Sequence, residues 1–188
     1  MSFPTDLLNQ ARKLASADPR RPRQATTPGD RARRPRQATV RRAVSTAYYA
    51  LFHFIGEESA KMLIGATNQD KMRRDLALRA IAHTKLKDVC KEFLKPVPKP
   101  VLQPFWGPAA IAGDANIATI CSAIIDLQEL RHTADYDLQS PIRKSDALDA
   151  CDTVESATNA WTHLRQTKPD AAALFATSVL LWPGLSGR

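Results

Sequence analysis

The chain has few of the residues that interrupt helices or build metal and redox sites. Among its 188 residues there are 7 glycines and 3 cysteines, and Cys90, Cys121 and Cys151 are far apart. No C-x-x-C pair, H-E-x-x-H motif or glycine-rich phosphate loop occurs. We therefore expect no disulfide framework, no metal site and no cofactor, and we expect the cysteines to be small core residues.

The sequence also lacks the segments that would direct a chain to a membrane. Its beginning, MSFPTDLLNQ, has no basic start followed by an apolar run. The longest apolar stretch, residues 171–182, is too short to span a bilayer and contains Thr177 and Ser178. We expect a cytoplasmic protein without membrane contact.

Alternation of apolar and polar residues, which would indicate strands, is absent as well. Apolar residues recur at helical spacing instead, and a hydrophobic content of 44% is enough for one bundle-sized core. The pattern predicts an all-α protein with helices over residues 3–17, 40–62, 68–94 (one or two helices), 116–137, 145–166 and 169–182. In the third of these the expected buried positions are Met72, Leu76, Ile81, Leu86, Val89 and Phe93.

The helix expected over residues 40–62 has two distinct faces. Thr39 stands where an N-cap would lie. One face is an apolar stripe of Val40, Val44, Ala47, Leu51, Ile55 and Met62. The opposite face is a narrow polar stripe of Arg42, Thr46, Tyr49 and His53, and it fits a ligand or partner contact as well as an ordinary contact between helices. We expect this helix to be buried on two sides.

A second helix carries charged residues in line with its apolar face. Arg131 follows the row of Ile117, Ile120 and Ile124, and Asp135 lies four residues further on, where it can pair with the arginine. His132 and Tyr136 form another pair at the same spacing beside it. A partly buried Arg131–Asp135 pair would hold helices together, and an open one would be a catalytic or ligand-binding site.

These two segments resemble the HEPN superfamily of small helical domains. The resemblance rests on RRAVSTAYYALFHF and LRHTADYDL, and it spans roughly residues 3–165. It implies an up-and-down helical bundle, often dimeric, with a short C-terminal helix added here. Many relatives are metal-independent ribonucleases of toxin–antitoxin and phage-defence systems, or they accompany a nucleotidyltransferase.

The chain departs from the ribonuclease signature of that superfamily. The signature is an arginine followed, after four to six residues, by a histidine, and here those positions after Arg131 hold Tyr136, Asp137 and Leu138. The candidate catalytic residues are therefore Arg131 with His132 or Tyr136, and Asp135 beside them. Loss of the histidine favours a degenerate binding or partner module as much as an active nuclease.

The net charge of +8 comes entirely from one segment. Residues 12–42 hold eleven Lys or Arg against Asp18 and Asp30, and the rest of the chain has slightly more acidic than basic residues. Within it, RRPRQAT occurs at residues 20–26 and again at 33–39, which indicates a tandem duplication inside a loop over residues 18–39. Either the loop is a solvated linker, or it binds nucleic-acid phosphates together with the next helix, through Arg20, Arg21, Arg23, Arg33, Arg34, Arg36 and Arg42.

Two further segments are marked by their composition, one rich in proline and one apolar. Residues 95–113 contain five prolines and read as an extended crossover, pinned to the body by Val101, Leu102, Phe105 and Trp106. We expect a bundle over residues 1–168, followed by a docking helix and tail over residues 169–188.

The leading expectation is a homodimeric, RNA-associated protein of a prokaryotic toxin–antitoxin or phage-defence system. Its partners would be RNA and a nucleotidyltransferase or another defence protein. One alternative is a metal-independent endoribonuclease, and the other is a protein-interaction subunit without nucleic-acid activity.

Overall fold

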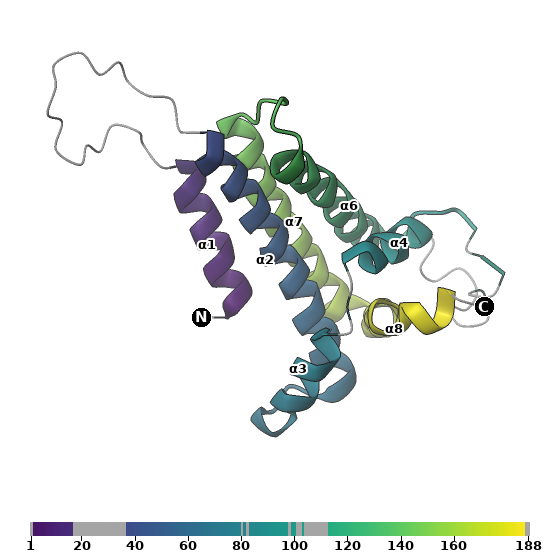
Figure 1. Ribbon diagram of the computed structural model, residues 1–188. Coiled ribbons are helices and arrows are strands. Elements are labelled where there is room, and N and C mark those ends of the chain that lie inside the picture. The colour runs from purple at the N-terminus through teal and green to yellow at the C-terminus, as the bar shows by residue number, and fades with distance from the viewer. Residues whose placement is uncertain are drawn as a thin grey trace, which may run out of the picture. The chain divides into compact units, whose positions relative to one another are not determined.

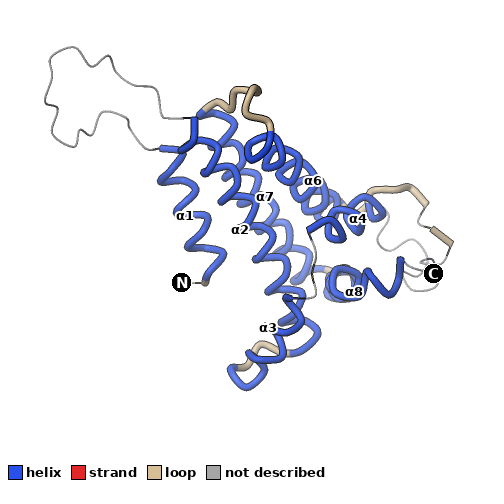
Figure 2. Tube along the Cα trace, viewed as in Figure 1, coloured by secondary structure: helices blue, strands red, loops and turns tan. Residues whose placement is uncertain are grey.

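The computed structural model describes residues 2–16, 37–79, 81, 83–97, 99–100, 103 and 113–186. Every regular element in those ranges is a helix, so the predicted all-α class is confirmed (Figures 1 and 2). None of the helices in this part of the chain has the length and apolar character needed to cross a membrane.

The helices follow the predicted segments, with the third segment divided in two. They are α1 (Phe3–Ser16), α2 (Gln37–Ile64), the 3-10 turn η1 (Asn68–Asp70), α3 (Lys71–Arg79), α4 (His83–Phe93), α6 (Ala115–Tyr136), α7 (Lys144–Thr167) and α8 (Pro169–Ser186). The tail helix α8 extends four residues beyond the predicted end at Trp182.

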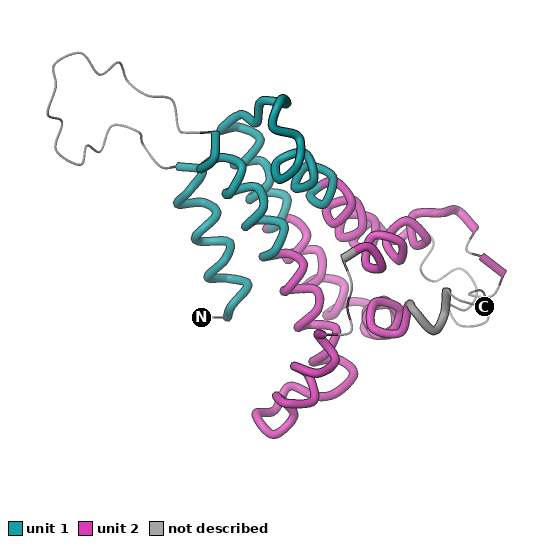
Figure 3. Tube along the Cα trace, in the orientation of Figure 1, with its two compact units in different colours: residues 1–50, 127–154 teal, residues 51–126, 155–188 magenta. Residues whose placement is uncertain are grey.

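The described contacts group the chain into two compact units, and three long helices contribute to both (Figure 3). Unit 1 comprises residues 1–50 and 127–154, and unit 2 comprises residues 51–126 and 155–188. Unit 1 therefore holds α1, the first part of α2, the end of α6 and the start of α7.

Unit 1 is a bundle of four helix segments that run in alternating directions (Figure 1). Its core combines alanines with a few branched residues, and small side chains allow helix axes to approach closely. The buried members are Ala15, Val40, Ala43, Val44, Ala134, Ile142 and Ala147, with Leu14, Leu130 and Leu148 packed around them.

The start of α2 differs from the prediction, because the helix already includes Gln37 and Ala38. Thr39 lies inside the first turn, so the predicted N-cap was wrong. The side-chain amide of Gln37 donates to the carbonyl of Ile142 at 2.9 Å and accepts from the amide of Ile142 at 3.2 Å. These two hydrogen bonds tie the first turn of α2 to a residue 105 positions away in the sequence.

The end of α6 is held by Arg41 of α2, which is only 9% exposed. Its Nη1 donates to the carbonyl oxygens of Thr133, Ala134 and Asp137 at 3.1, 2.9 and 2.9 Å, and its Nη2 donates to that of Ser140. The last carbonyls of a helix have no partner within the helix itself. Arg41 donates to these carbonyls, of which that of Thr133 also accepts the Asp137 amide at 3.1 Å, and it offsets the negative end of the helix dipole.

The turn from α6 to α7 is built from two aspartates. Asp137 accepts the amides of Gln139 and Ser140 at 3.1 and 3.2 Å, and its second oxygen accepts the Ser140 hydroxyl at 2.5 Å. The Ser140 contacts hold the pKa of the Asp137 carboxyl below its ordinary value. Asp146 accepts the amide of Arg143 at 2.7 Å and so caps the start of α7.

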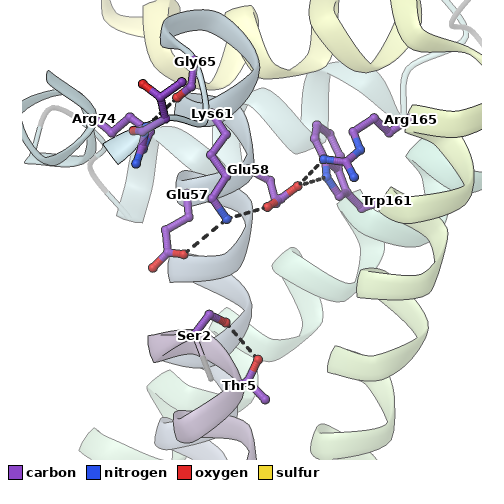
Figure 4. Close-up of polar contacts among 10 residues, drawn as sticks. Ser2, Thr5, Glu57, Glu58, Lys61, Gly65, Arg74, Trp161 and Arg165 are labelled. Carbon is purple, nitrogen blue, oxygen red and sulfur yellow. Dashed lines mark hydrogen bonds and ion pairs between the residues drawn. The ribbon is translucent and has the colours of Figure 1, made fainter. Parts of the chain in front are cut away.

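Unit 2 buries aromatic residues where α4, α7 and α8 meet. The rings of Phe93 and Phe175 lie 5.2 Å apart, and those of Trp161 and Phe175 lie 6.0 Å apart. Figure 4 shows Glu58 of α2 accepting from the Trp161 indole and from Arg165, both at 3.1 Å, and from Lys61 at 2.9 Å. The helix α8 is thus packed on its own unit rather than left free.

The expectation for the cysteines is confirmed, since all three are free thiols and fully buried. Burial, with a further contribution from neighbouring Cys90, raises the pKa of the Cys121 thiol well above its ordinary value. A thiol in this surrounding stays protonated and unreactive.

Two predicted core residues of the third segment, Met72 and Leu76, are 75% and 57% exposed, so that prediction was wrong. The short helix α3 packs through Leu78, whose Cδ2 lies 2.8 Å from where a Cβ on Gly56 of α2 would be. Met72 and Leu76 are more than about 100° away from Leu78 around the helix, so they face solvent. Leu86, Val89 and Phe93 are buried as predicted.

Two predicted segments fall largely outside the described residues. They include the arginine-rich loop up to residue 36, and the crossover residues Val101, Leu102, Phe105 and Trp106. Of the loop as predicted, only Gln37, Ala38 and Thr39 are described, and they belong to α2.

A pair of adjacent arginines tests the role of Arg41. We expect Arg41→Met to lower the free energy of unfolding by about 3 kcal/mol or more, because it leaves buried carbonyls without donors. Arg42→Met is the matched control, since Arg42 is exposed, and it should change stability by less than about 0.5 kcal/mol. Urea unfolding followed by circular dichroism measures both, and equal midpoints would contradict the role given to Arg41.

A second prediction concerns the repeated RRPRQAT. Deletion of residues 27–39 joins Thr26 to Val40 and places Gln24 where Gln37 stands. The contact with Ile142 is thereby restored, and we expect the thermal midpoint to stay within a few degrees. The additional change Gln24→Ala in the shortened chain should lower that midpoint, and the same substitution in the full chain should not. A large loss of stability on deletion alone would mean that the extra copy packs on the body.

Candidate functional site

The predicted catalytic residues lie on the last turns of α6 in unit 1, where they face the first part of α2. The structure brings Arg131 and Asp135 together with Ser45, Tyr48 and Tyr49, and we call these five residues the Arg131 cluster. His132 and Tyr136 stand beside it on α6 as a separate ring pair.

Arg131 is held by a carboxylate and by two tyrosine rings. Its Nε lies 2.9 Å from Oδ2 of Asp135, and its guanidinium carbon lies 5.5 Å and 5.2 Å from the ring centres of Tyr48 and Tyr49. The Nε–H does not point at the carboxylate, so the contact is an ion pair rather than a hydrogen bond. The side chains of Arg131 and Asp135 are 18% and 30% exposed, which makes the pair partly buried, as expected.

Asp135 is fixed through both of its oxygens. While Oδ2 faces Arg131, Oδ1 accepts the hydroxyl of Ser45 at 2.5 Å. Ser45 also lies 3.2 Å from the carbonyl of Arg41, one turn earlier in α2. The carboxylate therefore links the two helices, and it orients the guanidinium over the tyrosines.

His132 and Tyr136 form the exposed part of this region. Their ring centres are 4.9 Å apart with the planes tilted by 46°, and Tyr136 is 65% exposed. A large apolar ring held in solvent on a helix is a surface on which a flat partner can stack. The spacing of four residues seen in the sequence is what places the two rings together.

The predicted polar stripe of α2 lies opposite the buried face of the helix, but its four residues do not make one shared contact. Arg42 is exposed, and Thr46, Tyr49 and His53 are half-buried. Tyr49 joins the Arg131 cluster, whereas the Thr46 hydroxyl donates to the carbonyl of Arg42 at 2.7 Å within its own helix. His53 belongs to unit 2, where burial lowers its pKa.

Most of the predicted phosphate-binding arginines lie outside the described residues. Arg42 is described, and it is exposed near the start of α2. The nucleic-acid contact predicted for the loop therefore remains a prediction.

Sequence reasoning missed Arg41, Ser45 and the role of Tyr48. These residues follow one another at helical spacing along the flank of α2, and Arg41 and Tyr48 are buried. Arg41 lies on the same side of the helix as Tyr48, whereas Arg42 does not. That position around the helix is the signal that could have predicted burial of Arg41 and exposure of Arg42.

The arrangement is better suited to binding than to proton transfer. The carboxylate of Asp135 already pairs with Arg131, and His132 makes, among described residues, a ring contact with Tyr136 and no hydrogen bond. General acid–base chemistry needs an oriented donor or acceptor at the reacting group. The described part of the chain also contains no group of three or more His, Cys, Asp or Glu that could hold a metal ion.

A double-mutant cycle measures what the Arg131–Asp135 pair contributes. Because the carboxylate is 30% exposed, we expect Arg131→Met and Asp135→Ala each to lower the free energy of unfolding by about 1–2 kcal/mol, less than for a fully buried pair. The double variant should lose less than the sum, by about 0.5–1 kcal/mol. Strict additivity in urea unfolding would show that the two residues do not act together.

Comparison with known proteins returns no match: no protein-family model, no curated protein and no solved structure is similar to the chain. The functional interpretation therefore depends on the geometry of unit 1 and on the sequence resemblance.

Proposed function

We propose that the chain is an RNA-associated protein of HEPN type that binds single-stranded RNA on unit 1 and does not cleave it alone. The observation that carries this proposal is the exposed His132–Tyr136 ring pair at the end of α6. Unpaired bases stack on aromatic side chains, and cationic groups nearby attract the backbone phosphates. Double-stranded RNA offers no unstacked base for such a pair.

The absence of cleavage follows from how Arg131 is held. A ribonuclease of this kind needs an arginine that steadies the phosphate and a histidine placed for proton transfer. Here Asp135 and the two tyrosines already hold the guanidinium, and the position expected for the histidine is Tyr136. Binding without chemistry fits these contacts better than catalysis.

The biological setting in this proposal follows from the resemblance alone. It is a prokaryotic toxin–antitoxin or phage-defence system, in which the chain forms a homodimer and works with a nucleotidyltransferase or another defence protein. Under this proposal this chain binds the RNA, and the partner protein carries out the reaction.

Binding to a fluorescent single-stranded RNA oligonucleotide tests the proposal. We expect Tyr136→Ala to weaken affinity about tenfold, since one stacked base contributes about 1–3 kcal/mol. Leu138→Ala is the matched control, because Leu138 is 79% exposed two residues further on and should leave affinity unchanged. The measurement is fluorescence anisotropy at a fixed salt concentration, with an RNA duplex as the second probe.

Three results would contradict the proposal. In the first, Tyr136→Ala binds RNA as tightly as the unsubstituted chain does, and deletion of residues 27–39 abolishes binding. That result would place the RNA contact on the loop. Another is no RNA binding at all, which leaves the protein-interaction alternative. The last is robust cleavage in EDTA that disappears in both Arg131→Met and His132→Ala, which would establish the endoribonuclease alternative.

A further inference from the structure

A cavity of about 410 Å³ opens beside α4 in unit 2. Lys85 and Lys91 of α4 line it, together with Lys95 and Lys99 from the segment that follows and Trp182 of α8. Volumes of this size are typical of pockets that enclose a small ligand. Since the cavity belongs wholly to unit 2, its function does not depend on the RNA proposal.

Glu92 shapes this cavity by holding the chain that follows α4. Its side chain is only 4% exposed, and it accepts the Lys95 ammonium at 2.6 Å and the backbone amide of Lys99 at 2.8 Å. The segment after the helix therefore folds back over the helix end and brings two lysines to the cavity wall. The charge of Glu92 is compensated by these donors and does not oppose an anion there.

The cavity wall retains excess positive charge. Four lysines face two carboxylates, Glu92 and Asp88, and Glu92 is paired with Lys95. Asp88 lies 4.0 Å from the Lys85 ammonium, on side chains that are about half exposed. Among the described residues, the ammonium groups of Lys91 and Lys99 have no carboxylate within ion-pair distance. A concave surface with more positive than negative charge attracts anions.

The lining of the cavity indicates the chemistry of the ligand. Trp182 is only 2% exposed, so it contributes a buried ring rather than a hydrogen-bond donor to the wall. Ammonium groups without a carboxylate partner match an oxyanion rather than a cation or an apolar molecule.

We propose that this cavity binds a phosphate group, either free or carried by a small molecule. Lys91 and Lys99 supply the charge and donate to the phosphate oxygens. Glu92 acts as a positioning residue, because it holds Lys95 and Lys99 in place without facing the ligand.

Isothermal titration of the full chain with inorganic phosphate tests this proposal at low ionic strength. We expect saturable binding that Lys91→Glu and Lys99→Glu each weaken by about tenfold or more, since each removes a charged donor. Lys71→Glu is the matched control: it makes the same charge change at an exposed lysine of α3 and should leave affinity unchanged. Circular dichroism of each variant should show a folded chain.

Glycerol phosphate in a parallel titration separates the two sources of the group. Equal affinity for the ester and for inorganic phosphate supports a carried group, and preference for inorganic phosphate supports a free one. The proposal is wrong if no saturable binding occurs, or if Lys71→Glu weakens binding as much as Lys91→Glu and Lys99→Glu do. The latter result would mean attraction by the general charge of the chain.

Discussion

The contact between Arg41 and the end of α6 sets the alignment on which the rest of unit 1 depends. α2 and α6 run in opposite directions there, so each step along one helix meets an earlier residue of the other (Figure 1). Arg41 binds carbonyls from Thr133 to Ser140, Ser45 meets Asp135, and Tyr49 meets Arg131. A shift of one turn between the helices would separate all three contacts at once.

The two units balance buried charge in different ways. In unit 1 the most buried cation, Arg41, is compensated by backbone carbonyls. In unit 2 the buried charged groups among the described residues are the carboxylates of Glu92 and Asp114. Glu92 accepts from Lys95 and Lys99, and Asp114 accepts from Lys168 at 2.7 Å and from the amides of Asn116 and Ile117. Burial acts to raise the pKa of Asp114, but Lys168 and the helix amides outweigh it, and the pKa lies below its ordinary value. Each of these groups stabilises a helix end or a helix contact, where unpaired polar groups would otherwise be buried.

The sequence predicts those features that depend on local spacing. Helical periodicity gives the all-α class, and the positions four residues apart give the Arg131–Asp135 and His132–Tyr136 pairs, because neighbours on one helix meet whatever the tertiary structure. The sequence also separates exposed Arg42 from the buried face of α2, since polar residues recur at one angle around the helix.

Features that depend on distant parts of the chain were not predictable in this way. Arg41 donates to carbonyls that lie 92 to 99 residues away in the sequence. The residues next to it in the sequence therefore do not distinguish it from Arg42, and only its position around the helix does. Met72 and Leu76 have the spacing of core residues, but α3 is short and meets α2 through a different side. The first turn of α2 is tied to Ile142 through Gln37, a contact that no helix-start rule predicts.

The choice of arginine at position 41 has a consequence for which residues can replace it. The two terminal nitrogens of the planar guanidinium reach different carbonyls: Nη1 donates to Thr133, Ala134 and Asp137, and Nη2 donates to Ser140. A lysine carries the same charge but offers a single nitrogen on a flexible stem. It could not hold the end of α6 and the following turn at once, so the two basic residues are not interchangeable at this position.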